Sequence, residues 1–160
     1  MNGYLVRPVP PAALKELRDT DDAGRAPVPV TDDEGGSPLR CCLRHSVPGE
    51  RIALVSYAPL RRWAAATGAD PGAYDERGPV FVHAFAEDCA GPETDGLPFT
   101  NSHRVLRRYS ADGHILGGRL IGDPGAFPHA LREAFDDPSV AVVHVRAVEY
   151  GCFLYEVGRG

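Results

Sequence analysis

The sequence lacks any long apolar run. No stretch of eighteen apolar residues occurs in the 160-residue chain, so no segment has the length of a transmembrane helix. The N-terminal segment also lacks a seven-residue apolar run behind a basic leader, which a secretory signal would show. We therefore expect a cytoplasmic protein without a membrane partner. Its four cysteines are then expected to be free thiols, because cytosolic reductants keep thiols unpaired.

Clustered positive charge is also missing. The formal net charge is −5, and the basic residues are a single lysine, Lys15, and arginines spread along the chain. Binding to nucleic acid usually needs an extended positive surface, so we expect no nucleic-acid partner. The hydrophobic fraction of 43% and the charged fraction of 24% are those of an ordinary globular protein. The length fits one domain over residues 1–160.

Motifs with the spacing of metal ligands are absent as well. The chain has no CxxC, HExxH or paired-carboxylate motif, and the close pair Cys42 and His45 would face opposite sides of an extended strand. We therefore expect no metal and no cofactor. No glycine-rich phosphate loop follows a strand and no GxSxG elbow occurs, which argues against a dinucleotide-binding fold and an α/β-hydrolase.

What the sequence does contain is a series of short apolar segments separated by turn residues. These segments predict strands, most of them joined as hairpins, over residues 4–9, 39–46, 51–57, 78–85, 102–109, 114–122, 141–148 and 151–157. Strands 39–46 and 51–57 are expected to form one hairpin. The turn at 110–113 contains Asp-Gly, a strong signal for a second hairpin, and residues 141–148 and 151–157 are expected to form a third that turns near 149–151.

Short helices are predicted between some of these strands. Leu14 and Leu17 share a helical face after Pro10 and Pro11, a short helix is expected around residues 63–67, and residues 127–135 carry one apolar stripe. We expect an α+β fold, a predominantly antiparallel sheet with two or three short helices packed on it. Residues 19–38 and 87–98 are rich in Asp, Glu, Pro and Gly. We expect loops there, and a mobile one over 19–38.

Several of these segments also carry a family resemblance. They read RC (40–41), PGE (48–50), GPVFVH (78–83), RRYSADG (107–113), and VHVR followed by GCF (143–146 and 151–153). In this order and spacing the chain resembles the bacterial family of domains of unknown function numbered twelve-oh-three (DUF1203) over roughly residues 38–157. The resemblance implies a fold-sized unit and no established activity.

Position by position, the resemblance points to a set of polar and reactive residues. The chain departs from the family pattern in two places. The family has an acidic residue where this chain has Ser110, so no role is assigned to that position, and the loop at 19–38 is expected to be specific to this chain. The positions indicated are Cys41, Glu50, Tyr57, His83, Arg107, Tyr109, His144, Arg146 and Cys152.

His83 is the candidate proton carrier. It alternates with Phe81 and Phe85, so its imidazole is expected among aromatic side chains, where partial desolvation keeps the pKa of the imidazole near or below its ordinary value. A histidine in that state can act as general acid or base. Glu50 is expected in a turn, and a carboxylate there could orient His83 or an arginine. The alternative is a semi-buried histidine with satisfied partners and no function.

His144 and Arg146 are candidates for holding an anion. They alternate with the apolar residues 141, 143, 145 and 147, so both point to the other face of the strand. The alternative is an ordinary solvent-facing surface. Cys41 alternates with Leu39 and Leu43, which predicts an inert buried thiol. Cys152 lies at the start of a strand, and the sequence leaves open whether it is a core residue or a reactive thiol.

Two classes of function follow, and whether the protein is an enzyme stays open. The first is a small cofactor-independent enzyme that isomerises, eliminates from, condenses or cyclises a small metabolite, with His83 as proton carrier. Arg107, Arg146 and His144 would hold an anionic group, and Tyr57 or Tyr109 would line the pocket. The second is a non-catalytic module that binds a small anion or a protein partner. A homodimer is a third expectation.

Overall fold

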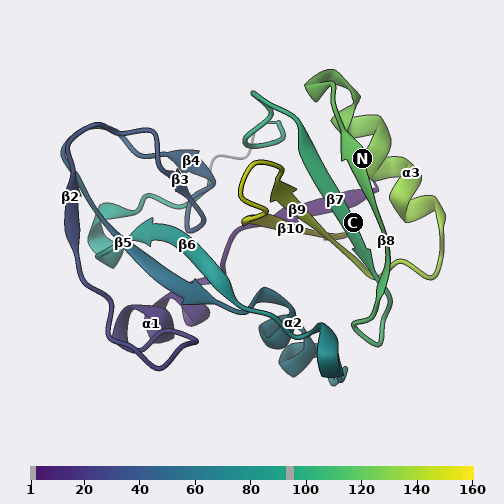
Figure 1. Cartoon of the computed structure of the whole chain (residues 1–160), viewed down its shortest axis with the longest axis horizontal. Coiled ribbons are helices and arrows are strands. Elements are labelled where there is room, and N and C mark those ends of the chain that lie inside the picture. The colour runs from purple at the N-terminus through teal and green to yellow at the C-terminus, as the bar shows by residue number, and fades with distance from the viewer. Residues whose placement is uncertain (1–2, 93–95) are drawn as a thin grey trace. The chain divides into compact units, whose positions relative to one another are not determined.

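The chain divides into two compact units that alternate along the sequence. The computed structural model describes residues 3–92 and 96–160, and Figure 1 shows their helices and strands. Unit 1 comprises residues 1–7, 58–76 and 100–160, and unit 2 comprises residues 8–57 and 77–99. Among the described helices, none has the length and apolar character needed to cross a membrane. Whether the two units behave as the single domain expected from the sequence stays a prediction.

Unit 1 is built on a five-stranded antiparallel sheet. The order across the sheet is β1 (Tyr4–Arg7), β10 (Phe153–Arg159), β9 (Val142–Ala147), β7 (Arg104–Tyr109) and β8 (Ile115–Ile121). The hairpins β7–β8 and β9–β10 confirm the two hairpins predicted for this part of the sequence. Gly113, at φ +83°, closes the β7–β8 turn by donating its N–H to the Ser110 carbonyl at 2.9 Å.

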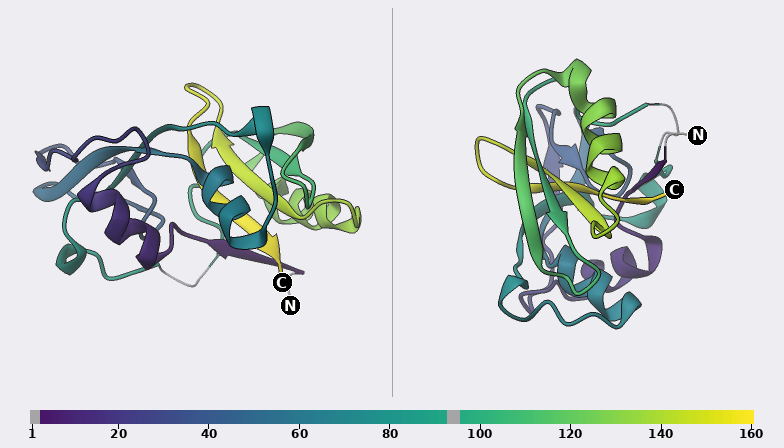
Figure 2. Two further views of the ribbon diagram at one scale, coloured as in Figure 1. Left: turned by 90° about the horizontal axis from the view of Figure 1, so that it is seen from below. Right: turned by 90° about the vertical axis from the view of Figure 1, so that its right-hand side faces the viewer.

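Helices cover both faces of this sheet (Figure 2). Helix α3 (Phe127–Asp136) buries the whole predicted stripe of Phe127, Ala130, Leu131, Ala134 and Phe135, and lies over the face that carries Leu106. Helix α2 (Pro59–Thr67) packs Leu60 and Trp63 against Tyr109 and Val142 on the opposite face. Strand β9 is therefore buried on both sides.

Unit 2 contains a second five-stranded sheet. Its order is β2 (Val30–Asp32), β5 (Glu50–Tyr57), β6 (Gly78–His83), β3 (Pro38–Leu39) and β4 (Arg44–His45). All of its pairings are antiparallel except that of β3 with β6. Helix α1 (Pro11–Asp19) buries Ala13, Leu14 and Leu17 in the core of this unit. Short 3₁₀ helices complete the fold: η1 (Gly72–Tyr74) and η3 (Pro124–Ala126) in unit 1, η2 (Ala86–Asp88) in unit 2. The α+β class is confirmed.

The strand predicted over residues 39–46 is wrong. The chain turns back between β3 and β4, with Leu43 at φ +58° and its N–H bonded to the Leu39 carbonyl at 2.8 Å. The hairpin predicted with residues 51–57 is wrong for the same reason, since β5 pairs with β2 and β6 instead. Apolar alternation did not reveal this turn, because the segment contains neither glycine nor proline between its two short strands.

Residues 19–38 are not wholly irregular. They include β2, and two aspartates organise the turns on either side of it: Asp21 accepts the Ser56 N–H at 3.0 Å, and Asp32 accepts the Gly35 N–H at 2.9 Å. The mobility of this segment stays a prediction. The loop predicted over residues 87–98 falls partly outside the described residues, at 93–95.

We predict that Asp32→Asn lowers the stability of the protein at neutral pH. Hydrogen bonds from the Ser46 hydroxyl (2.5 Å) and the Gly35 N–H lower the pKa of Asp32, so its stabilising effect is present above the unfolded value of about 4 and is lost as pH falls below it. Urea denaturation of wild type and variant should therefore differ at pH 7 and converge towards pH 3. Asp33→Asn, at an exposed neighbour, is the control, and an equal effect from it would contradict the prediction.

Candidate functional site

The pairing of β5 with β6 places Glu50 beside His83. Ile52 pairs directly with His83, and Glu50, two residues before Ile52, lies on the same face of the sheet. Residues diagonal to one another across two antiparallel strands are close enough for long side chains to touch. An Nε2–Oε2 hydrogen bond joins His83 to Glu50. Glu50 thus lies beside His83, and its role in orienting the imidazole stays a prediction.

The β3–β4 turn brings two thiols to the other side of the same ring. The Arg40 N–H bonds to the Phe81 carbonyl at 2.9 Å, which fixes the turn next to the end of β6. The Cys41 sulfur lies 3.3 Å from Nδ1 of His83 and accepts the His83 backbone N–H at 3.2 Å. The Cys42 sulfur lies 3.8 Å from the same nitrogen. An extended strand would have separated these neighbouring side chains, and the turn brings them together.

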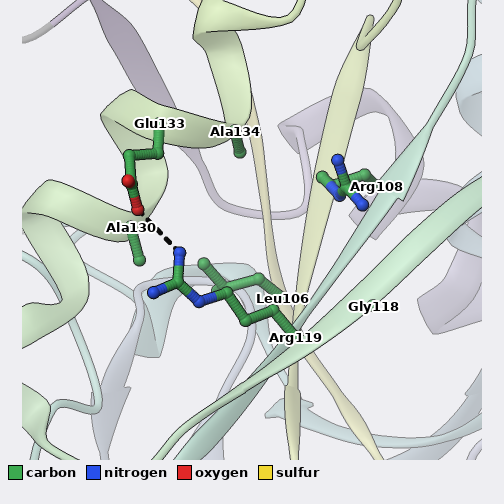
Figure 3. A pocket seen from close by; sticks show the side chains of 7 residues that line it. All are labelled: Leu106, Arg108, Gly118, Arg119, Ala130, Glu133 and Ala134. Atoms are coloured by element: carbon green, nitrogen blue, oxygen red, sulfur yellow. Dashed lines mark hydrogen bonds and ion pairs between the residues drawn. The ribbon is translucent and has the colours of Figure 1, made fainter.

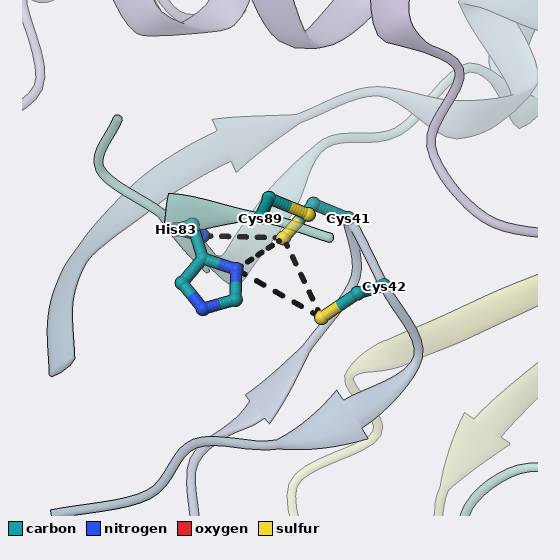
Figure 4. A group of neighbouring side chains, drawn as sticks. All are labelled: Cys41, Cys42, His83 and Cys89. Atoms are coloured by element: carbon teal, nitrogen blue, oxygen red, sulfur yellow. Dashed lines mark hydrogen bonds between the residues drawn. The ribbon is translucent and has the colours of Figure 1, made fainter. Parts of the chain in front are cut away.

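A third thiol completes the cluster. Cys89 caps η2, and its sulfur lies with those of Cys41 and Cys42 and a ring nitrogen of His83 within 4.8 Å of one another. Figure 4 shows the sulfur atoms gathered on one side of the His83 ring. Cys41 and Cys42 are buried and Cys89 is partly exposed. We call these four residues the thiol–imidazole cluster.

Glu50 is itself firmly held. Arg44 donates to both carboxylate oxygens, at 2.8 and 3.1 Å, and the Val47 N–H donates at 2.9 Å. The Arg44 guanidinium, more than any other neighbour, lowers the pKa of Glu50 to about 2, against the opposing effect of burial. Glu50 is therefore a carboxylate across the physiological range, and it presents a negative charge to a fully buried imidazole.

The two adjacent thiols differ in acidity. The hydrogen bond from Cys41, together with the Arg44 N–H and the positive charges nearby, lowers the pKa of Cys42 to about 6 although burial opposes the shift. The Cys42 hydrogen bond and burial raise the pKa of Cys41. One thiolate is favoured beside His83, because a second negative charge at 3.9 Å would be repelled.

The separations among Cys41, Cys42 and His83 fit three corners of a tetrahedral metal site. Zinc bound at about 2.3 Å from sulfur and 2.0–2.1 Å from nitrogen places sulfurs about 3.8 Å apart and sulfur about 3.5 Å from nitrogen. The observed values are 3.9 Å for the two sulfurs of Cys41 and Cys42, and 3.3 and 3.8 Å from these sulfurs to Nδ1 of His83. A histidine that ligates a metal typically bonds a carboxylate through its other nitrogen, as His83 does.

A second polar group lies in unit 1. On one face of its sheet, Arg107 pairs with His144, and Arg146 lies next along β9. Arg107 forms an ion pair with Glu76, and Arg146 approaches the same carboxylate oxygen at 3.5 Å. Arg107 also donates to the Tyr109 hydroxyl at 3.4 Å. Four predicted residues, Arg107, Tyr109, His144 and Arg146, are therefore neighbours on this sheet.

His144 does not face solvent. It is fully buried, its ring packs against Tyr109 and Phe153 at 4.8 and 5.0 Å, and its Nε2 lies 3.3 Å from a Glu156 oxygen. The interpretation of this strand face as an ordinary solvent surface is therefore wrong at His144. Strand β9 is central in the sheet and covered by helices on both sides, so alternation of residue types does not mark exposure there.

The predicted residues therefore fall into two groups. His83, Glu50 and Cys41 meet in unit 2. The neighbours on the other sheet and Cys152 belong to unit 1: Arg107, Tyr109, His144, Arg146 and Cys152. Tyr57 is buried at the opposite end of β5 from Glu50. Cys152 is partly exposed, 4.0 Å from the Tyr150 carbonyl. A single pocket shared by His83, His144, Arg107 and Arg146 stays a prediction.

Described residues line cavities in both units. One of about 360 Å³ in unit 1 lies between β7, β8 and α3, on the face of the sheet opposite Arg107 and His144, where Arg119 and Glu133 form an ion pair at 2.6 Å (Figure 3). In unit 2, a cavity of about 440 Å³ is lined by Arg44 and Glu50, and another of about 520 Å³ is lined by Cys41 and Cys89. The 520 Å³ cavity therefore reaches the thiol–imidazole cluster.

Sequence reasoning missed Cys42 and Cys89. It compared Cys42 only with His45, on the assumption of one strand, and found no pair with metal-ligand spacing. The available signal was weaker: two adjacent cysteines after a short apolar segment, and Cys89 six residues beyond His83. The parallel pairing of β3 with β6 brings the two cysteines of the turn close to His83 and Cys89, and this pairing is not visible in the sequence.

The fold and the site define an α+β protein of two largely antiparallel sheets with a thiol–imidazole cluster at the end of β6. The DUF1203 family model, described as a protein of unknown function, matches residues 36–159. The chain therefore belongs to this family, which confirms the resemblance found in the sequence. No curated protein and no solved structure matches the chain.

We predict that Glu50→Gln destabilises the protein by about 1–3 kcal/mol, because it leaves Arg44 and the buried His83 without their anionic partner. Urea denaturation at pH 7 measures the change. Glu87→Gln is the matched control, since this side chain is 71% exposed and lies 3.8 Å from Arg51; it should change stability by less than about 0.5 kcal/mol. Equal effects of the two variants would show that Glu50 is not a structural partner of the cluster.

We also predict that His144 makes the protein less stable in mild acid. Burial lowers the pKa of His144, so the folded protein keeps the imidazole neutral while the unfolded chain takes up a proton near pH 6.5. Stability should fall as pH drops below about 6.5, by at most about 1.4 kcal/mol per pH unit. Urea denaturation at several pH values gives the free energy of unfolding as a function of pH. Between pH 6.5 and 5 its slope should be smaller for His144→Leu than for wild type, and unchanged for His129→Gln, at an exposed histidine. Identical slopes in all three proteins would refute this origin.

Proposed function

We propose that the protein binds Zn²⁺ through Cys41, Cys42, His83 and Cys89. The observation that carries the proposal is the convergence of three thiols on one imidazole. Cys41, Cys42 and Nδ1 of His83 lie at separations close to the edges of a zinc tetrahedron, and the ligand atoms of all four residues, Cys89 included, lie within 4.8 Å of one another. Thiolates and imidazole are the ligands that zinc prefers among protein side chains. All four residues belong to one compact unit, so the geometry of the set depends on that unit alone.

The surroundings of the cluster support the same proposal. The carboxylate of Glu50 on Nε2 of His83 leaves Nδ1 directed at the sulfurs, which is the tautomer a metal at Nδ1 requires. The lowered pKa of Cys42 and the positive Arg44 nearby favour thiolate over thiol. Three thiolates and Zn²⁺ carry one net negative charge.

Four protein ligands make a closed site, which is typical of structural zinc. The ion would join the β3–β4 turn, the end of β6 and the end of η2, three segments that are separate in the sequence. Free energy of metal binding then contributes to the folding of unit 2. We therefore expect metal removal to destabilise the protein.

The protein purified in the presence of zinc should contain about one Zn²⁺ per chain by elemental analysis. Cys42→Ser and Cys89→Ser should each lose most of it, because each removes one ligand, and Glu50→Gln should weaken zinc affinity about 10–100-fold in a chelator competition. Replacement by Co²⁺ should give thiolate-to-metal charge-transfer absorption.

Cys152→Ser is the matched control, since Cys152 is a partly exposed thiol in the other unit. Its zinc content should equal that of wild type. Wild-type protein that binds no zinc, or a loss of zinc as large in Cys152→Ser as in Cys89→Ser, would contradict the proposal.

A second candidate is an enzyme that keeps His83 as the proton carrier expected from the sequence but adds Cys41, which was expected to be inert, as its nucleophile. The observation that favours it is the series Glu50, His83, Cys41, in which the two ring nitrogens contact a carboxylate and a thiol. His83 would take the proton of Cys41, against the Cys42 hydrogen bond and the burial that raise the pKa of this thiol, and the resulting thiolate would face the 520 Å³ cavity as a nucleophile towards a small metabolite. Because both nitrogens of His83 are engaged within the protein, its proton transfer to a substrate would pass through this thiol.

The Cys89→Ser variant separates the two candidates. Zinc binding needs Cys89, whereas the pair of Cys41 and His83 does not. If the protein is a thiol enzyme, iodoacetamide should alkylate Cys41 in wild type and Cys89→Ser alike, and His83→Gln should slow the reaction. If it binds zinc, Cys41 of the wild type should resist alkylation until a chelator removes the metal. The non-catalytic ligand-binding module and the homodimer stay predictions, and sedimentation velocity tests the latter.

A further inference from the structure

The 520 Å³ cavity of unit 2 has the character of a small-molecule site. Such sites commonly enclose about 300–1,000 Å³, with apolar walls and a few polar groups that fix the ligand. Val9 and Leu14 are buried apolar residues that line this cavity, together with Pro8 and Pro11. Helix α1 supplies one wall, because Pro11, Leu14, Lys15 and Arg18 recur at the spacing of one helical face.

The charged residues that line the cavity are both cations. Lys15 and Arg18 are among its described lining residues, and none of those residues is an aspartate or a glutamate. Lys15 is also the single lysine of the chain. A pair of cations beside an apolar cavity, within a protein of net charge −5, favours an anionic ligand over a cationic one.

Arg18 holds a donor that lacks a partner. Its Nε donates to the His83 carbonyl at 3.0 Å, which fixes the guanidinium group against the end of β6. Its Nη2 is buried and has no hydrogen-bond partner among the residues that the structure describes. A buried donor without a partner costs free energy. Arg18 also lines the cavity, so a small rotation of its guanidinium group would let a carboxylate bound there satisfy this donor.

We propose that this cavity binds a small carboxylic acid with an apolar chain. The carboxylate accepts hydrogen bonds from Arg18 Nη2 and from the Lys15 ammonium group, and the chain lies against Val9 and Leu14. Because Arg18 contacts the backbone of His83, the bound acid lies beside the thiol–imidazole cluster. The inference goes beyond the zinc proposal and does not require it.

Octanoate is the probe, titrated into the full chain by isothermal calorimetry, with the zinc content of every sample measured. Octanoate should bind saturably, and octan-1-ol, which has the same chain without the charge, should bind at least about tenfold more weakly. Arg18→Met should weaken octanoate binding at least about tenfold, and Lys15→Met by a smaller factor because Lys15 is exposed. Arg132→Met, which removes one positive charge from α3 in the other unit, should leave octanoate binding unchanged.

Near-ultraviolet circular dichroism establishes that each variant is folded, and Lys15→Met tests the site should Arg18→Met fail to fold. Three results would overturn the inference: no saturable binding of octanoate to the wild type, equal binding of octanoate and octan-1-ol, or an equal loss in Lys15→Met and Arg132→Met. Zinc content is measured separately. Wild-type protein that binds octanoate but contains no zinc after purification in its presence would therefore refute the metal proposal and leave this inference standing.

Discussion

The buried imidazole of His83 is the constraint on which unit 2 depends. Its side chain has no exposed surface, so both ring nitrogens must find partners inside the protein. Glu50 meets one nitrogen because β5 and β6 pair in a register that puts them on the same face. The β3–β4 turn meets the other with two thiols. The turn, the bent segment after β6 and the Arg44–Glu50 ion pair are all arranged around this ring.

The buried histidine of unit 1, His144, has different surroundings. His144 has one weak polar contact, at 3.3 Å to Glu156, and is otherwise held between the rings of Tyr109 and Phe153. Its Nδ1 has no hydrogen-bond partner among the described residues. Burial in an aromatic environment therefore sets its charge state, whereas polar neighbours set the environment of His83. The contrast favours unit 2 as the location of the proposed metal site, because among the described residues a set of possible ligands converges on His83 and none converges on His144.

Much of the fold could be predicted from the sequence because most of its segments obey local rules. The apolar stripe of α3, the Asp-Gly turn before β8 and the apolar alternation of β6 each specify their structure within a few residues. The turn at residues 40–43 could not be predicted, because it is stabilised by contacts with β6, more than thirty-five residues away. The site followed the same division: His83, Glu50 and Cys41 were named as candidates from the sequence. Cys42, which that turn brings beside Cys41, and Cys89 were not.

Metal binding gives the adjacent thiols Cys41 and Cys42 a physical reason to share one ring nitrogen. Thiols are weak hydrogen-bond donors and acceptors, so three of them compensate poorly for the burial of an imidazole. Thiolates would bind the ring's proton more strongly, but two of them 3.9 Å apart repel each other in a buried site. The proposed divalent cation would remove this repulsion, with Cys41, Cys42, Cys89 and the ring nitrogen as its ligands, and Glu50 would hold the remaining N–H. A thiol that is only hydrogen-bonded to His83 would not require a carboxylate on the other ring nitrogen. Glu50 therefore fits an imidazole that is held in position to bind the proposed metal.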